Sequence, residues 1–208
     1  QLALLLGIAA ACKITIFELV DSAVASAASC VAPGAYRHIE IQLHRTVITD
    51  LSIGDYVSRT NVEILDGVGF HALEQRLVAF IADQFLAQSS FDPLHQANTE
   101  QLLFNELPNW LELLDRQREI IVHIDYRRSR FEVSLSREDI VEVVQPLYLE
   151  IQDRLLRDDR CLIGERLGAM PGFAGSRENQ IVLPEDAVFN GCATLVEKSY
   201  TENNGVSL

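Results

Sequence analysis

The sequence is short of basic residues, and this shortage excludes one class of partner. Its 208 residues include 17 Lys and Arg against 30 Asp and Glu, which gives a formal net charge of −13. Nucleic-acid binding needs clustered cations that neutralise phosphates, so no nucleic-acid partner is expected. The densest basic stretch, Arg127-Arg128-Ser129-Arg130, separates two strand-like runs and is interpreted as a solvated hairpin tip.

Paired cysteines and long hydrophobic runs are missing as well. No two of the four cysteines form a Cys-x-x-Cys pair: Cys12, Cys30, Cys161 and Cys192. Metal and redox motifs are therefore not expected, and reduced thiols in a cytoplasmic protein are the default interpretation. The apolar opening, residues 2–11, is too short to cross a membrane and lacks a basic leader, so it is predicted to form a buried helix. Because the chain does not begin with Met, we expect it to be part of a longer protein.

What is present is typical of a folded globular chain, with 48% hydrophobic and 23% charged residues. The most regular stretch, residues 38–51, alternates apolar and polar side chains with a period of two. This pattern predicts two β-strands joined by a tight bend at the centre of an α/β unit. The residues predicted to share the buried face are Ile39, Ile41, Leu43, Val47 and Leu51.

The polar face of this stretch carries three side chains that could in principle bind a metal, namely His38, Glu40 and His44. Residues six apart in an extended strand are about 20 Å from each other, so the three could meet only if the strand bends between them. We therefore interpret them as a polar strand face without a metal.

Helical and extended segments surround the central stretch. Apolar residues at three- and four-residue spacing predict a helix after Gly69 that is broken at residues 89–93, and Trp110 is expected in the core. Ser136 is predicted to cap the helix at residues 140–157. The other predicted helices are residues 23–29, 99–118 and 187–198, and the other extended segments are residues 13–20, 57–65, 119–126 and 130–135.

Four short motifs occur in the order in which one known family has them. Residues 16–28 are similar to its strand, Asn-Glu-Pro-Thr turn and alanine-rich helix, and residues 69–81 are similar to its Gly-Gly-x-x-Phe-Asp-x-x-Leu helix. Residues 135–140 are similar to its Ser/Thr-Arg-x-x-Phe-Glu helix start, and residues 184–193 to its Pro-Asp-Glu-Ala-Val-x-x-Gly-Ala-Ala ending. The chain thus resembles the second lobe of the actin-like ATPase superfamily, and within it the nucleotide-binding domain of the DnaK-like, seventy-kilodalton heat-shock chaperones.

The resemblance implies an α/β fold of the actin-like or ribonuclease-H-like kind, with a mixed twisted sheet flanked by helices and an inserted α+β subdomain. Residues 1–69 and 136–208 would form the core of the lobe, and residues 70–135 would form the insertion.

The resemblance also implies a function. The chain would be the second lobe of a chaperone ATPase in a longer parent protein, contributing to a cleft for ATP or ADP with Mg²⁺. Its partners would be the missing first lobe and protein clients. Because the first lobe is absent, these 208 residues alone are not expected to hydrolyse ATP. One alternative is a non-hydrolysing relative that acts as a protein-interaction scaffold. Another, the lobe of a sugar or acid kinase, needs a substrate-facing Asp that the sequence does not identify.

By resemblance, the family's second phosphate loop, Asp-x-Gly-Gly-Gly-Thr, falls on Glu40 to His44, with Arg45 and Thr46 after it. None of its glycines is kept, and glycines let backbone amides approach phosphates, so their loss favours the non-hydrolysing alternative. His44, Arg45 and Thr46 could instead offer side-chain donors to a phosphate. The turn at residues 66–69, ahead of a helix, could present amides to an anion or could need its glycines for backbone reasons alone.

The adenosine side of the family's cleft is also only partly matched. Glu106 stands where the family has a base-clasping Glu, and Asn109 stands where it has a Lys. Gly164, Gly168 and Pro171 resemble a Gly-Gly-x-x-x-x-Pro segment that lines the adenine pocket through its backbone. No catalytic residue can be assigned from these motifs.

Overall fold

The computed structural model describes residues 2–28, 32–175 and 178–204, and Cys30 lies outside these ranges. The chain divides into two compact units: residues 32–185 form the larger, and residues 1–31 together with residues 186–208 form the smaller. Each unit is described by itself. The predicted insertion, residues 70–135, lies entirely within the larger unit.

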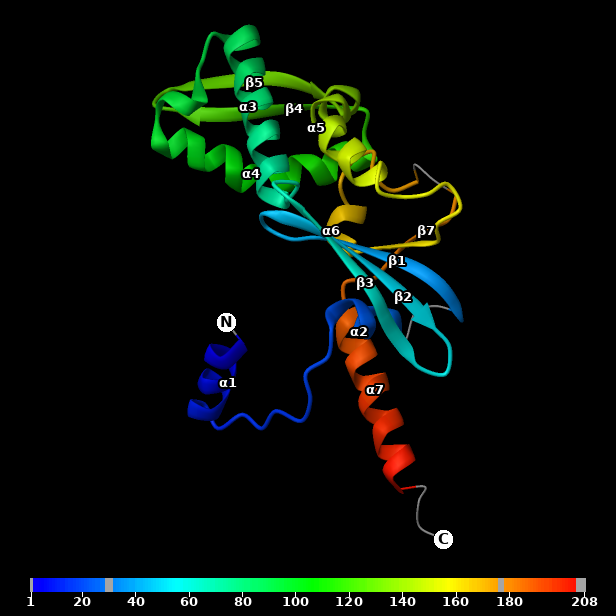
Figure 1. Ribbon diagram of the computed structural model, residues 1–208. Coiled ribbons are helices and arrows are strands. Elements are labelled where there is room, and N and C mark those ends of the chain that lie inside the picture. Colours follow the sequence, from blue (N-terminus) through cyan, green and yellow to red (C-terminus); the bar gives the residue numbers. More distant parts are fainter. Residues whose placement is uncertain (1, 29–31, 176–177, 205–208) are drawn as a thin grey trace. The chain divides into compact units, whose positions relative to one another are not determined.

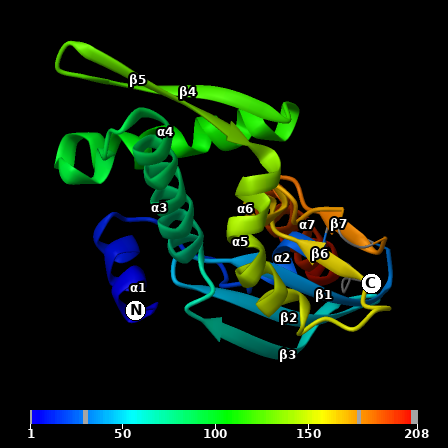
Figure 2. The ribbon, with the colours of Figure 1, turned by 90° about the horizontal axis from the view of Figure 1, so that it is seen from above.

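The larger unit is built on a mixed five-stranded sheet, as expected of an α/β chain (Figures 1 and 2). Its strand order is β3-β2-β1-β6-β7. The strands are β1 (Gly34–Ile41), β2 (Arg45–Ile53), β3 (Val57–Asp66), β6 (Cys161–Ile163) and β7 (Gln180–Val182). β1, β2 and β3 form an antiparallel meander, whereas β6 and β7 run parallel to β1 on its other side. The strands predicted in residues 38–51 and 57–65 are confirmed. β6 and β7 were not predicted, because three residues are too few to show a period.

The β1–β2 hairpin distributes its side chains differently from the prediction. The bend between the strands, residues 42–44, has an odd number of residues, and Ile39 pairs with Ile48. Odd-numbered residues of β1 therefore share a face with even-numbered residues of β2. The prediction of a single buried face was wrong. Val47 pairs with Glu40 and so lies on the face of the sheet that Ile39 does not share, and Leu43 in the bend is 54% exposed. Nor is the other face polar and solvated, since His38 and Thr49 on that face are buried. Thr46, on the same face as Ile39, is buried as well.

A second, two-stranded sheet lies at the far end of a helix that leaves β3 (Figures 1 and 2). In chain order these elements are α3 (Phe70–Ser89), η1 (Pro93–His95), α4 (Ala97–Arg116), β4 (Glu119–Tyr126), β5 (Ser129–Ser136), α5 (Arg137–Gln152) and α6 (Glu165–Gly168). The predicted helices and the predicted hairpin are confirmed, and α4 runs without interruption through Pro108. α5 ends at Gln152, short of the predicted position 157, and α6 was not predicted.

Local hydrogen bonds explain where α5 begins. The Ser136 hydroxyl accepts a hydrogen bond from the Asp139 amide (3.1 Å) and donates one to the Asp139 carboxylate (2.6 Å). This is the predicted cap, except that the carboxylate binds the serine hydroxyl.

One side chain of α3 extends the second sheet. Gln88 Nε2 donates to the carbonyl oxygen of Ser134 (3.1 Å), and the Ser134 amide donates to Gln88 Oε1 (2.9 Å). The amide group of Gln88 thus satisfies both main-chain groups of Ser134 in the second half of β5.

A single apolar core runs through the larger unit and joins its two sheets by way of α3, α4 and α5. Four of the α3 residues predicted to face inward are buried: Leu73, Leu77, Ile81 and Phe85. Trp110 of α4 is 7% exposed, which confirms its predicted place in the core.

The described part of the smaller unit consists of α1 (Leu2–Ala11), α2 (Ser22–Ala28) and α7 (Ala187–Asn204). Two predictions were wrong here, because α1 has no buried residue and residues 13–20 form no strand. The two other predicted helices are confirmed. They pack so closely that a side chain at Gly191 of α7 would overlap the main-chain carbonyl of Ala25 in α2.

Candidate functional site

Two neighbouring parallel strands of the larger sheet, β1 and β6, end at the same edge, and from there the chain continues to opposite sides of the sheet. From β1 the chain proceeds to β2 and β3, whereas from β6 it proceeds to β7 on the other side. In open α/β sheets, ligands bind outside the carboxyl ends of the strands at such a reversal of strand order. A ligand site is therefore expected at the carboxyl ends of β1 and β6.

The bend after β1 and the start of α3 are hydrogen-bonded to each other at this edge. The Phe70 amide donates to the Gln42 carbonyl oxygen (2.9 Å), and the His71 amide donates to that of Leu43 (2.9 Å). The Gly67 amide donates to the carbonyl oxygen of His44 (3.0 Å). Three amides at or near the helix start therefore have partners within the protein.

Gly69 permits this close approach. A Cβ at this position would lie 2.6 Å from Cα of His44 and closer still to the peptide group that follows. The turn at residues 66–69 therefore needs this glycine because of the neighbouring backbone. The first amides of a helix are the groups that would bind an anion, and here those of Phe70 and His71 face carbonyl oxygens, so an anion site at this turn is not supported.

Most of the side chains predicted to replace the lost glycines are also engaged. Thr46 is fully buried, and its hydroxyl donates to the carbonyl oxygen of Val68 (2.6 Å). Arg45 Nε donates to Gln42 Oε1 (2.9 Å). The exposed His44 packs edge-on against the ring of His71, with centroids 5.6 Å apart. Glu40 is half-buried at the end of β1, close to Gly164.

A pocket of about 440 Å³ lies beside this edge, between α3, α4 and α6. Phe70 begins α3 next to the bend, and Glu165 begins α6 directly after β6. The principal apolar side chains of the lining are Phe70, Leu107, Leu111 and Met170. Its charged side chains are Glu74, Glu112, Asp115, Glu165 and Arg166. A volume of this size and a mainly apolar lining with a few polar groups are typical of small-molecule sites.

The residues predicted for the adenosine side are each next in sequence to a residue that lines this pocket, but none of them lines it. Glu106 accepts a hydrogen bond from Asn109 Nδ2 (3.2 Å). The Gly164 amide donates a hydrogen bond to the carbonyl oxygen of Ile39 (2.9 Å), and Gly168 packs against the side chain of Val182.

The third residue of that predicted segment, Pro171, accepts a hydrogen bond at its carbonyl oxygen from the Tyr148 hydroxyl (3.0 Å). Burial raises the pKa of the Tyr148 phenol, so this hydroxyl stays protonated and remains a donor. The segment around residues 164–171 is therefore held in place, and four of its residues line the pocket: Glu165, Arg166, Ala169 and Met170.

Sequence reasoning missed the charged residues of this pocket. A signal was present, because Leu107, Leu111 and Asp115 follow one another at four-residue spacing and so share one face of α4. The contribution of α6 could not have been found, since a four-residue helix leaves no periodic pattern.

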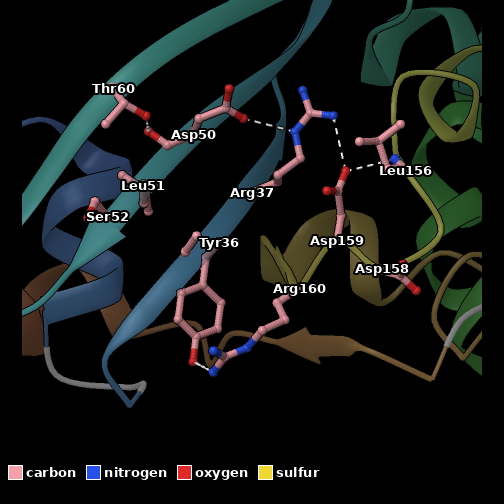
Figure 3. Close-up of a pocket in the computed structure, with 11 residues that line it drawn as sticks. Tyr36, Arg37, Asp50, Leu51, Ser52, Thr60, Leu156, Asp158, Asp159 and Arg160 are labelled. Carbon is pink, nitrogen blue, oxygen red and sulfur yellow. Dashed lines mark hydrogen bonds and ion pairs between the residues drawn. The ribbon is translucent and has the colours of Figure 1, made fainter.

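A second cavity, of about 700 Å³, lies at the opposite, amino-terminal end of β1 (Figure 3). Arg37 points into it and is surrounded by Asp50 (2.9 Å), Asp159 (3.3 Å) and Glu63 (3.7 Å). Burial alone would lower the pKa of Arg37, but the hydrogen bonds and charges of Asp50 and Asp159 outweigh it and raise that pKa. The guanidinium carbon of Arg160 lies over the ring of Tyr36, 4.0 Å from its centroid.

The charges of this second group are largely paired with one another, since Arg37 contacts three carboxylates and Glu63 also contacts Arg154 (3.3 Å). Arg37 lies on β1 and Asp159 in the segment that follows α5, so their ion pair ties that segment to the sheet. We interpret the cavity as a structural junction and the pocket beside α6 as the candidate site.

Within residues 2–28, 32–175 and 178–204, no three His, Cys, Asp or Glu side chains are grouped closely enough to hold a metal ion. No helix in these ranges has the length and the apolar character needed to cross a membrane. Comparison of the chain with protein-family models and with curated protein sequences gave no significant match.

Proposed function

We propose that this protein is a non-hydrolysing relative of the DnaK-like, actin-like ATPases, in which residues 32–185 keep the architecture of the second lobe as a binding scaffold. The observation that carries the proposal is the bend at residues 42–44. In the family this position is a glycine-rich phosphate loop. Here the carbonyl oxygens of the bend accept hydrogen bonds from the amides of Gly67, Phe70 and His71.

The sheet supports the family part of the proposal. An antiparallel meander followed, across a long connection, by two strands parallel to its first strand is in keeping with a ribonuclease-H-like core. The long connection, residues 67–160, includes residues 70–135, which carry α3, α4 and the β4–β5 hairpin and have the α+β composition expected of an inserted subdomain.

The test is a calorimetric titration of ATP with Mg²⁺ into the full-length protein, together with an assay for released phosphate. We expect no saturable heat at nucleotide concentrations approaching the millimolar range and no phosphate release. Saturable binding followed by hydrolysis would overturn the proposal.

A second candidate function has its own supporting observation. The pocket between α4 and α6 lies beside the carboxyl ends of β1 and β6, where a nucleotide cleft would place its ligand. If the lobe serves a working ATPase, the same titration gives saturable heat with ATP. The two candidates are therefore separated by one experiment.

A further inference from the structure

The pocket beside α6 has a charge pattern that selects among small ligands. Four carboxylates and one guanidinium line it. Two of the carboxylates are paired with arginines outside the lining, Glu112 with Arg116 (2.6 Å) and Asp115 with Arg137 (3.5 Å). Counting these arginines leaves four negative charges against three positive ones, an excess of one negative charge.

This excess comes from the two carboxylates of the lining that have no arginine partner, which stand against the single cation of the lining. Glu74 of α3 is half-buried and Glu165 of α6 is exposed, and neither forms an ion pair with a described residue. The one cation of the lining, Arg166, lies over the ring of Phe70 with its guanidinium carbon 5.4 Å from the centroid. That ring therefore already meets a positive charge, as aromatic faces favour.

We propose that this pocket binds a small organic cation, a primary ammonium group on an apolar or aromatic body. The body would fill the space lined by Phe70, Leu107 and Met170, and the ammonium would be held by Glu74 and Glu165. An anionic ligand would meet the same two carboxylates and would be repelled. This inference adds a ligand class to the site of the proposed scaffold and rests on that proposal only in assuming that no phosphate is bound.

The test uses three ligands of nearly equal size and different charge: phenethylamine, 2-phenylethanol and 3-phenylpropionate. Each is titrated into the full-length protein at low and at high salt. We expect phenethylamine to bind about tenfold more tightly than the neutral alcohol, because hydrogen bonds to charged groups contribute on that scale, and the carboxylate to bind most weakly. The advantage of the amine should shrink at high salt, since partly exposed charges are screened.

Variants of the protein locate the effect. Glu74→Gln combined with Glu165→Gln should remove most of the amine's advantage over the alcohol while leaving binding of the alcohol unchanged. Glu150→Gln, on the exposed side of α5 and outside the lining, is the matched control and should behave as the parent protein. Equal affinities for the three ligands, or tighter binding of the carboxylate, would overturn the inference.

The outcomes for the two proposals remain distinct. Hydrolysis of ATP overturns the non-hydrolysing function whatever the amine does. Absence of amine selectivity in a protein that also ignores ATP overturns only the ligand class.

Discussion

Replacing Gly69 by alanine is the most direct test of the close packing between the β1–β2 bend and α3. The backbone of Gly69 has φ −125° and ψ 174°, which any residue can adopt. Without a steric conflict, fewer unfolded conformations would favour alanine by about 0.4–1 kcal/mol, while the poorer N-cap that alanine makes for α3 would offset a similar amount, so the net change should be small. The structure predicts a clear loss instead.

The magnitude follows from the surroundings of the added methyl group. It would lie 2.6 Å from Cα of His44, whereas carbon atoms in favourable contact are about 3.5–4.0 Å apart. The bend must then move away by about 1 Å, which weakens the hydrogen bonds donated by Gly67, Phe70 and His71. At about 0.5–1.5 kcal/mol for each bond, together with the cost of overpacking, we expect a loss of about 2–4 kcal/mol in the free energy of unfolding.

Urea unfolding followed by tryptophan fluorescence measures this loss. Trp110 is the only tryptophan and is buried in the same unit, so its signal reports on the unit that carries the substitution. With a urea m-value of about 2 kcal/mol/M, in the middle of the usual range, the midpoint should fall by about 1–2 M.

Gly54→Ala is the matched control, because nothing lies within 4 Å of a methyl group there. It should leave the midpoint unchanged or slightly raised. If Gly69→Ala proves as stable as Gly54→Ala, the bend is not held against α3 as described, and the explanation for the missing phosphate site fails with it.

Two further substitutions test packing and charge elsewhere. Gly191→Ala should reduce amide-exchange protection in α2, because the new methyl group would overlap the carbonyl of Ala25; Gly7→Ala, in open space within a helix, should not, and protection unchanged in both would refute the close α2–α7 contact. Arg37→Met should lower the free energy of unfolding by about 1–3 kcal/mol, because it leaves clustered carboxylates without their partly buried cation. Arg116→Met, which breaks only an exposed ion pair, should cost less than about 0.5 kcal/mol in the same urea titration, and equal losses would show that Arg37 has no special role.

The spacing of apolar residues predicted correctly those elements in which the buried residues recur at the same spacing. The α3 stripe from Leu73 to Phe85 repeats at helical spacing and packs as predicted, since one face of a long helix meets the core throughout. The β1–β2 hairpin was predicted as an element but not as a pair of faces. The number of residues in a bend sets the register, and no alternation pattern reveals it.

The misses share a physical cause, which is dependence on a partner. Residues 13–20 are rich in β-branched residues, but a strand forms only where a neighbouring strand completes its hydrogen bonds, and β-propensity measures the fit to such a surface. α1 was predicted to be buried because it is apolar, yet burial requires a surface to pack against. The candidate pocket was missed for the same reason, since Glu74 and Glu165 come to line one pocket only after the chain has folded.

The contact between Gln88 and Ser134 has a consequence for how the molecule meets others of its kind. A two-stranded sheet exposes two edges, and an open edge invites a foreign strand to add itself and begin aggregation. The side-chain amide of Gln88 binds Ser134, in the second half of β5, as a strand would, and it comes from a helix that cannot propagate the pairing. An incoming strand would first have to displace it, so this part of the β5 edge is protected by one residue.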